Sequence, residues 1–222
     1  MDTAMEARSG ILKIGCALLD KKLVAGTWGN VSARVPGTGT IAVTPSGRNY
    51  RDLQETDIVL TDIDGNVIDG GLKPSSELQM HLAIYRARTD IMAIIHTHSI
   101  FASSCAVANK SIPPIIEDLV QVIGGSVDVA KYALPGTNEL AENVVAALGH
   151  KGAALLANHG VVCCGANLRE ALLACELVER AAQIFIYASQ IGGAIDLSTN
   201  DIETMHNFYL QHYRKRQKGG LI

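Results

Sequence analysis

The feature that most constrains this chain is a pair of histidines, His96 and His98, that directly follows a short apolar run, residues 91–95. The length of the run and its isoleucines favour a buried strand. Side chains at positions i and i+2 of a strand point to the same side. We therefore expect a sheet in which one interior strand ends in two imidazoles that face a common point.

A second apolar run, residues 153–157, leads into Asn158 and His159. A single histidine at the end of a strand is usually a plain core residue. A His-x-His pair together with a third such histidine instead favours a metal site, because three histidines leave a tetrahedral zinc with one open position for chemistry. We predict one Zn²⁺ per chain, bound by His96, His98 and His159.

Two hydroxyl-rich turns are candidates for binding an anion. The strand expected at residues 40–44 runs into a Pro-Ser-Gly turn containing Ser46 and Gly47, where backbone amides can point outward together. A helix is expected to start near Ser75, and its free amides, with the Ser75 and Ser76 hydroxyls, can bind an anion. A turn without a ligand remains an alternative for Ser46 and Gly47.

Glu77 follows in the expected first turn of that helix. A carboxylate there often only complements the helix dipole. It could also serve as an acid/base group beside the metal strand. His81, one turn later on the same face, could orient Glu77 or be a core histidine. Asn30 follows a tight loop, residues 26–29, where it could donate a hydrogen bond to a ligand.

The composition indicates an ordered globular protein rather than a disordered, secreted or membrane protein. The chain has 222 residues, of which 48% are hydrophobic and 18% charged, and we expect one domain spanning 1–222. A formal net charge of -3 gives no reason to expect nucleic-acid binding. The start lacks a signal-peptide pattern, and no apolar run is long enough to span a bilayer. The five cysteines are odd in number and lack Cys-x-x-Cys spacing, which indicates a cytoplasmic protein with reduced thiols.

The order of expected elements places the chain in the α/β class. Helical and strand patterns are mixed without strict alternation, which predicts a mixed or mostly antiparallel central sheet with helices on both faces. Helices are expected at residues 4–25, from 75, at 99–108, 137–149, 167–191 and 199–216.

Taken together, these motifs resemble the class II aldolase/adducin family over about residues 10–190. The motifs are Gly26-Thr-Trp-Gly-Asn-Val-Ser32, Thr44-Pro-Ser-Gly47, Pro74-Ser-Ser-Glu77, His96-Thr-His98 and Asn158-His-Gly160. The resemblance implies a single domain of three layers, a zinc on the three histidines, and Glu77 as the acid/base. It also implies a homotetramer with active sites at subunit contacts. The sugar phosphate group would be bound by Asn30, Ser46, Gly47, Ser75 and Ser76.

The activity implied by the resemblance is the reversible cleavage of a ketose 1-phosphate, similar to L-fuculose 1-phosphate, into dihydroxyacetone phosphate and a small aldehyde. Zinc can stabilise the enediolate that forms, so no Schiff-base lysine is needed. A dehydratase or aldolase of the same family acting on methylthioribulose 1-phosphate is an alternative. An epimerase of the same family has the motif Pro-Ser-Ser-Asp at the position where this chain has Pro-Ser-Ser-Glu77. A non-catalytic adducin-like assembly module is disfavoured by the intact histidines and Glu77.

The chain departs from the family at a tyrosine that a neighbouring subunit contributes to the aldehyde side of the site. The matching region, residues 114–121, contains no tyrosine. Glu117 or Asp118 is a candidate for that role. Relatives also use a C-terminal tyrosine, for which Tyr213 is the first candidate here and Tyr209 the second. The aldehyde therefore stays open between lactaldehyde, acetaldehyde and a methylthio-aldehyde.

Overall fold

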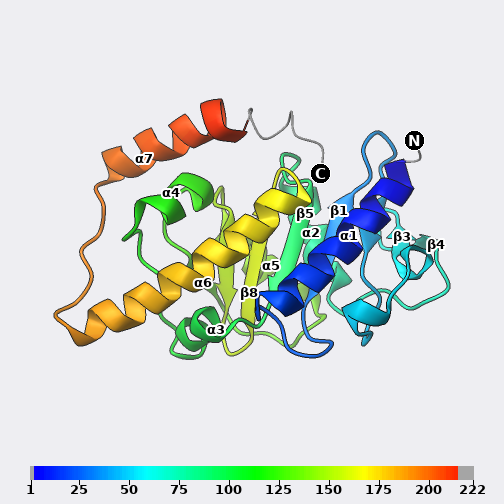
Figure 1. The fold of residues 1–222 in the computed structure, drawn as a ribbon, viewed down its shortest axis with the longest axis horizontal. Coiled ribbons are helices and arrows are strands. Elements are labelled where there is room, and N and C mark those ends of the chain that lie inside the picture. Colours follow the sequence, from blue (N-terminus) through cyan, green and yellow to red (C-terminus); the bar gives the residue numbers. More distant parts are fainter. Residues whose placement is uncertain (1–2, 215–222) are drawn as a thin grey trace.

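One mostly antiparallel sheet forms the centre of the molecule (Figure 1). The computed structural model describes residues 3–214. Within that range the strand order is β4-β3-β2-β1-β5-β8-β7-β6, and only the β6–β7 pair is parallel. This confirms the predicted α/β class. The strands are β1 (Asn30–Arg34), β2 (Ile41–Val43), β3 (Val59–Thr61), β4 (Val67–Asp69), β5 (Ala93–Thr97), β6 (Asp128–Ala130), β7 (Ala153–Leu156) and β8 (Gly160–Gly165).

Helices cover both faces of the sheet, and the pleat of the strands sorts the core between them. On β5, Ala93 and Ile95 pack into the cluster beneath α1 (Thr3–Asp20) and α6 (Leu168–Gln190). Ile94 points the other way, into the cluster beneath α2 (Leu78–Ala87) and α5 (Asn138–Leu148). His96 shares the parity of Ile94 and so points to the α2 side. The remaining helices are α3 (Ile100–Val107), α4 (Glu117–Ile123) and α7 (Thr199–Phe208).

Side chains cap the starts of two expected helices, and a third expected helix starts later than predicted. The Thr137 hydroxyl accepts from the Leu140 amide at 3.2 Å at the start of α5. The Asn167 side chain accepts from the Glu170 amide at 2.8 Å at the start of α6. The prediction that a helix starts near Ser75 is wrong, since α2 begins three residues later. The Ser75 amide donates to the Thr44 carbonyl at 3.0 Å, and this ties the residue to a neighbouring loop instead.

The C-terminal segment stays helical to the last described residue, Arg214, and changes its hydrogen-bond pattern on the way. α7 ends at Phe208, and a single π turn, η3 (Tyr209–Tyr213), follows. The expected helix end at residue 216 lies outside the described residues. Across residues 3–214, no helix combines the length and the apolar character that crossing a bilayer requires.

Candidate metal centre and active site

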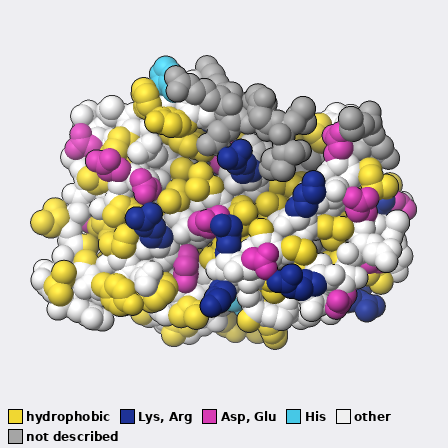
Figure 2. All heavy atoms as spheres, viewed as in Figure 1, with side chains coloured by type: hydrophobic (Ala, Val, Ile, Leu, Met, Phe, Trp, Pro, Cys, Tyr) yellow, Lys and Arg dark blue, Asp and Glu magenta, His cyan; other side chains and the backbone are white. Residues whose placement is uncertain are grey.

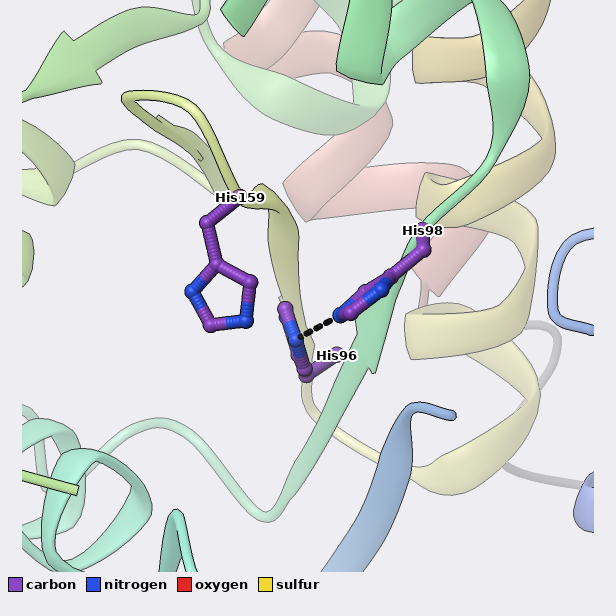
Figure 3. Close-up of side chains that lie close together, drawn as sticks. All are labelled: His96, His98 and His159. Carbon is purple, nitrogen blue, oxygen red and sulfur yellow. Dashed lines mark hydrogen bonds between the residues drawn. The ribbon is translucent and has the colours of Figure 1, made fainter. Parts of the chain in front are cut away.

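Three histidines meet at the end of β5, as Figure 3 shows. His96 lies on β5, His98 follows the last residue of that strand, and His159 lies in the turn between β7 and β8. Because β8 pairs with β5 and places Val162 opposite His96, the turn lies beside the end of β5. One ligand atom from each histidine lies within 4.8 Å of the others. The sequence prediction that these three side chains converge is confirmed.

The β7–β8 turn depends on two unusual backbone positions. Asn158 has a φ of 55°, in the left-handed region that asparagine tolerates better than most residues. Gly160 packs directly against β5. A Cβ there would lie 3.0 Å from Cδ2 of His98 and would overlap the Thr97 carbonyl oxygen. Glycine therefore allows His159 to approach the two histidines that follow β5.

The protonation of the histidines suits a metal ligand set. Nδ1 of His96 lies 3.0 Å from the Val161 carbonyl and donates to it, which leaves a lone pair on Nε2. That Nε2 lies 2.8 Å from Nε2 of His98. Burial lowers the pKa of His96 to about 3 and of His159 to about 4, and it also lowers the pKa of His98. Neutral imidazoles whose lone pairs converge are what a bound metal requires.

Glu77 directs its carboxylate at this cluster. It is the N-cap residue of α2 and is only 7% exposed. Its Oε2 accepts a hydrogen bond from Asn30 Nδ2 at 2.9 Å and lies 3.2 Å from Nε2 of His96. Its Oε1 lies 3.4 Å from Nε2 of His159. Because β1 pairs with β5 and places Asn30 opposite His96, Asn30 holds the carboxylate against the histidines.

His81 is a core residue rather than a hydrogen-bond partner of Glu77 in the described structure. It is fully buried, and its Nδ1 forms a hydrogen bond of 2.6 Å with Ser32 Oγ. The Tyr85 hydroxyl lies 2.9 Å from the same Ser32 oxygen. Burial lowers the pKa of His81 to about 3, so the side chain is neutral at pH 7.

The two hydroxyl-rich turns lie side by side. A β-bridge joins Pro45 to Pro74, and the Ser46 amide donates to the Lys73 carbonyl at 3.0 Å. Ser46, Gly47 and Ser76 are exposed, whereas Ser75 is buried. A cleft of about 440 Å³ opens beside Gly47, with Thr27 and Arg48 in its lining. The fold thus brings the predicted anion-binding residues into one surface next to Asn30 and Glu77.

The two candidates for the aldehyde side lie elsewhere in the chain. Glu117 is exposed at the start of α4, and Tyr213 is 48% exposed in η3. The neighbouring Leu210 lines a cavity with Ile91 and Gly165, which lie at the opposite end of β5 and β8 from the histidines. Tyr213 is therefore separated from the histidine cluster of its own chain by the length of these strands.

Sequence reasoning assigned no role to Trp28, which lies beside the candidate metal site. Its ring centroid is 5.8 Å from that of His98, and the side chain is 66% exposed. The signal that could have indicated it was its place in the 26–32 motif, two residues before Asn30.

The family model described as Class II Aldolase and Adducin N-terminal domain matches residues 9–186. The chain belongs to this family. The resemblance inferred from the sequence motifs is thereby confirmed, and so is the fold that the class II aldolase resemblance implied.

Individual class II aldolases are similar over most of the chain. The 5-deoxy-D-ribulose 1-phosphate aldolase of Bacillus thuringiensis serovar kurstaki is 36% identical over 198 residues, covering 89% of this chain and 92% of the relative. The L-fuculose phosphate aldolase of Escherichia coli (strain K12) is 39% identical over 161 residues, covering 72% and 74%. A solved L-fuculose 1-phosphate aldolase superposes with a TM-score of 0.89 at 38% identity, covering 92% and 96%. These names confirm the prediction of an enzyme of the class II aldehyde-lyase type.

Proposed function

We propose that the protein is a zinc-dependent aldolase that reversibly cleaves a ketose 1-phosphate into dihydroxyacetone phosphate and a small aldehyde. The observation that carries this proposal is the Glu77 carboxylate, which lies 3.2 Å from His96 and 3.4 Å from His159 beside a cluster of three neutral histidines, of which His96 is fully buried. A base beside a metal site is the arrangement needed to move a proton next to a carbonyl group.

The histidines His96, His98 and His159 would hold the zinc. When bound, the zinc would supply Lewis-acid stabilisation of the negative charge that develops on the substrate oxygens. The paired turns carrying Ser46, Gly47, Ser75 and Ser76, together with Asn30, would bind the phosphate group and so fix the carbonyl carbon near Glu77. The β-bridge between Pro45 and Pro74, which joins the two turns, and the hydrogen bond from Asn30 to Glu77 support this placement.

The proton transfers can be assigned to residues of two chains. Cleavage breaks the bond between C3 and C4, and its electron pair passes toward C2 to give an enediolate. Glu77 delivers the proton that C3 then takes up, and Asn30 keeps that carboxylate in position. The C4 hydroxyl loses its proton as the aldehyde forms. The group that accepts it would be Tyr213 or Glu117 of a second copy of the chain. Tyr213 is separated from the histidine cluster of its own chain by the length of β5 and β8.

A homotetramer with active sites at subunit contacts fits this assignment of the proton transfers to residues of two chains. Hydrophobic side chains lie between charged ones over the face shown in Figure 2. Tyr187 on α6, and Ile191 and Ile195 in the link that follows, are 53%, 88% and 90% exposed. Large apolar side chains that are this exposed are typical of surfaces that pack against another chain. We further propose that 1–222 forms one domain and that the protein is cytoplasmic, for which its five free cysteines are the support.

The aldehyde is the part of the substrate that the site does not specify. The named relatives act on an L-fuculose phosphate and on 5-deoxy-D-ribulose 1-phosphate, so both candidates should be assayed. The dehydratase alternative would eliminate water and release no aldehyde. The aldolase names of the relatives favour cleavage.

The test combines metal analysis with two reactions. The purified protein should contain one zinc per chain and should exchange the carbon-bound proton of dihydroxyacetone phosphate in deuterated water. It should also release an aldehyde from one of the two ketose 1-phosphates. Metal with dehydration and no aldehyde would establish the dehydratase instead. Absence of both metal and exchange, after reconstitution with zinc, would favour the assembly module.

A further inference from the structure

The C-terminal segment, residues 199–214, is held to the body of the molecule with little apolar burial. Figure 1 shows α7 lying across α4 at the edge of the molecule, reached through an extended link. None of the α7 residues is buried. In η3 the buried residue is Tyr209. Because Ile202, Met205 and Leu210 are only partly buried, hydrophobic packing supplies part of the docking and polar contacts add to it.

One buried carboxylate makes most of those contacts. Glu170, in the first turn of α6, is 2% exposed. Its Oε2 accepts from the Ala166 amide at 2.8 Å. Its Oε1 accepts from the Tyr209 hydroxyl at 3.2 Å and from Arg214 Nε at 2.9 Å. A buried charge is tolerated only when such partners surround it, so the carboxylate strongly favours the docked position of both residues.

The space around this contact is not filled by side chains. A cavity of about 120 Å³ lies between the segment and the body, with His206, Leu210 and Arg214 on one side and Gly165 on the other. The other polar contact is from Nδ1 of His206 to the Gln121 carbonyl, at 2.8 Å. The Glu170 contacts therefore fix the position of the C-terminal segment at a place where side-chain packing alone does not.

Tyr213 lies between the two residues that Glu170 holds. The Arg214 amide donates to the Tyr209 carbonyl and closes the single π turn. The Tyr213 ring lies parallel to the Tyr209 ring, with an interplanar angle of 12° and centroids 6.5 Å apart. With Tyr209 and Arg214 both bound to one carboxylate, the turn that carries Tyr213 is held at its two ends, and its side chain stays exposed.

We propose that Glu170 is a positioning residue for the aldehyde side of the reaction, because it holds the π turn that presents Tyr213 to the active site of a second copy of this chain. The inference rests on the proposed aldolase function and takes Tyr213, rather than Glu117, as the group that accepts the C4 hydroxyl proton. It adds a residue that touches neither the metal site nor the substrate.

The two reactions of the proposed enzyme separate this role from a general effect on folding. Exchange of the carbon-bound proton of dihydroxyacetone phosphate needs the histidines, Glu77 and the phosphate turns. Cleavage of the ketose 1-phosphate needs these groups and, in addition, Tyr213. A residue that acts through Tyr213 should affect cleavage and leave exchange intact.

The experiment compares Glu170→Gln and Arg214→Met with Tyr213→Phe in the zinc-loaded full-length protein. A misplaced reacting group costs on the order of 100-fold in rate, so kcat for cleavage should fall by up to about that factor in all three variants. The KM for the ketose 1-phosphate and the exchange rate should stay within about twofold. Arg214→Lys, which keeps a charge for Glu170, should recover part of the loss.

The matched control is Glu176→Gln on the same helix. Glu176 pairs with the exposed Lys21 at 3.1 Å and has no contact with the C-terminal segment among the described residues. This variant should keep both reactions.

Four outcomes are decisive. Normal cleavage in Glu170→Gln and Arg214→Met, beside a defective Tyr213→Phe, would overturn the inference and leave the aldolase proposal standing. Loss of both exchange and cleavage in Glu170→Gln and in Arg214→Met would show that Glu170 has a purely structural role and would also overturn the inference. Normal cleavage in Tyr213→Phe would remove the residue that Glu170 is said to position. Absence of both reactions in the unmodified protein would instead contradict the proposed function.

Discussion

The two ends of β5 and β8 place candidate catalytic groups by different means. At one end, His96 and its neighbours are fixed by strand pairing, by a tight turn and by a buried hydrogen bond from Asn30 to Glu77. At the other end, the segment that carries Tyr213 is docked through polar contacts over a cavity of about 120 Å³. A metal site needs side chains held to within a fraction of an ångström, and the central strands of a sheet provide that.

A segment that serves another subunit has a different requirement. Its functional side chain must stay exposed until the second chain covers it, so the segment cannot bury a large apolar face of its own. A buried carboxylate with two long-range partners gives it a defined position without such a face. We therefore expect changes at the histidine end to abolish both proton exchange and cleavage, and changes at the C-terminal end to reduce cleavage alone, through the position of Tyr213, with only small losses of local stability.

The largest effect is expected from Glu77→Gln. The amide keeps the shape of the carboxylate but cannot carry the proton, so proton exchange at dihydroxyacetone phosphate should fall by about 10²–10⁴-fold. Zinc content should be unchanged. Exchange would be followed by proton NMR in deuterated water. An undiminished rate would remove Glu77 from the mechanism.

The second-largest effect is expected from the removal of a metal ligand. His98→Ala should weaken zinc binding by more than about 100-fold, the upper range for loss of a residue that only supports a ligand. Competition with a chromophoric chelator measures the affinity. His150→Ala, at an exposed histidine outside the cluster, is the control and should bind zinc normally. Full metal content in His98→Ala would rule out the ligand assignment.

Acid should destabilise the metal-free protein through His81, which is fully buried beneath the site. Burial lowers its pKa from 6.5 to about 3. The unfolded chain therefore takes up this proton first, so stability is retained above pH 6.5 and is lost as the pH falls toward 3. Each pH unit in this window costs about 1.4 kcal/mol for one such group.

The groups that face His81 are Ser32 and Tyr85, together with Glu77 and His96. Urea unfolding of the chelator-treated protein at pH 7 and pH 5 measures the loss. His81→Asn keeps a hydrogen-bond partner for Ser32 but does not titrate, and it should reduce the loss by about 2 kcal/mol. An identical pH dependence in the two proteins would contradict the assignment.

Gly160→Ala should destabilise the histidine end by about 1–3 kcal/mol, the usual cost of forcing an extra group into a packed site. The new Cβ would meet the Thr97 carbonyl and the His98 ring. Urea denaturation measures the change, and zinc affinity should fall with it. Gly71→Ala is the control because nothing lies within 4 Å of its added Cβ. Equal stabilities of the two variants would show that the β7–β8 turn has room to adjust.

The smallest effect is expected at the C-terminal end. His206→Ala removes one hydrogen bond, to the Gln121 carbonyl, and should lower the local opening free energy of α7 by about 0.5–1.5 kcal/mol. Hydrogen exchange resolved by mass spectrometry should show faster exchange in α7 and no change in β8. If β8 changed as much as α7, the two ends would be one cooperative unit.

Local sequence patterns predicted the histidine end well and the C-terminal end poorly. His96 and His98 follow an apolar run, and strand periodicity alone indicates that they share a side. Thr137 and Asn167 cap helices through contacts three residues away, which local sequence also indicates. Metal binding and catalysis by these residues stay predictions.

The parts that sequence reasoning missed depend on contacts between distant residues. α2 begins at Leu78 rather than near Ser75, and the Ser75 amide donates to the Thr44 carbonyl, on a separate loop. Glu170 meets Tyr209 and Arg214 across 39 and 44 residues of chain. Sequence reasoning assigned Glu170 no functional role, because no local rule connects it with the C-terminal segment.

The backbone around the histidines also bears on how the protein acquires its ion. The positions of His96, His98 and His159 are set by β5–β8 pairing and by the close packing of Gly160 against β5. Both features form as the chain folds. The site can therefore be filled after folding is complete. Imidazole sites bind several divalent ions in an order set by the ion's own chemistry rather than by the protein. The ion found after expression will consequently follow the supply in the growth medium, and zinc should be added deliberately before activities of different preparations are compared.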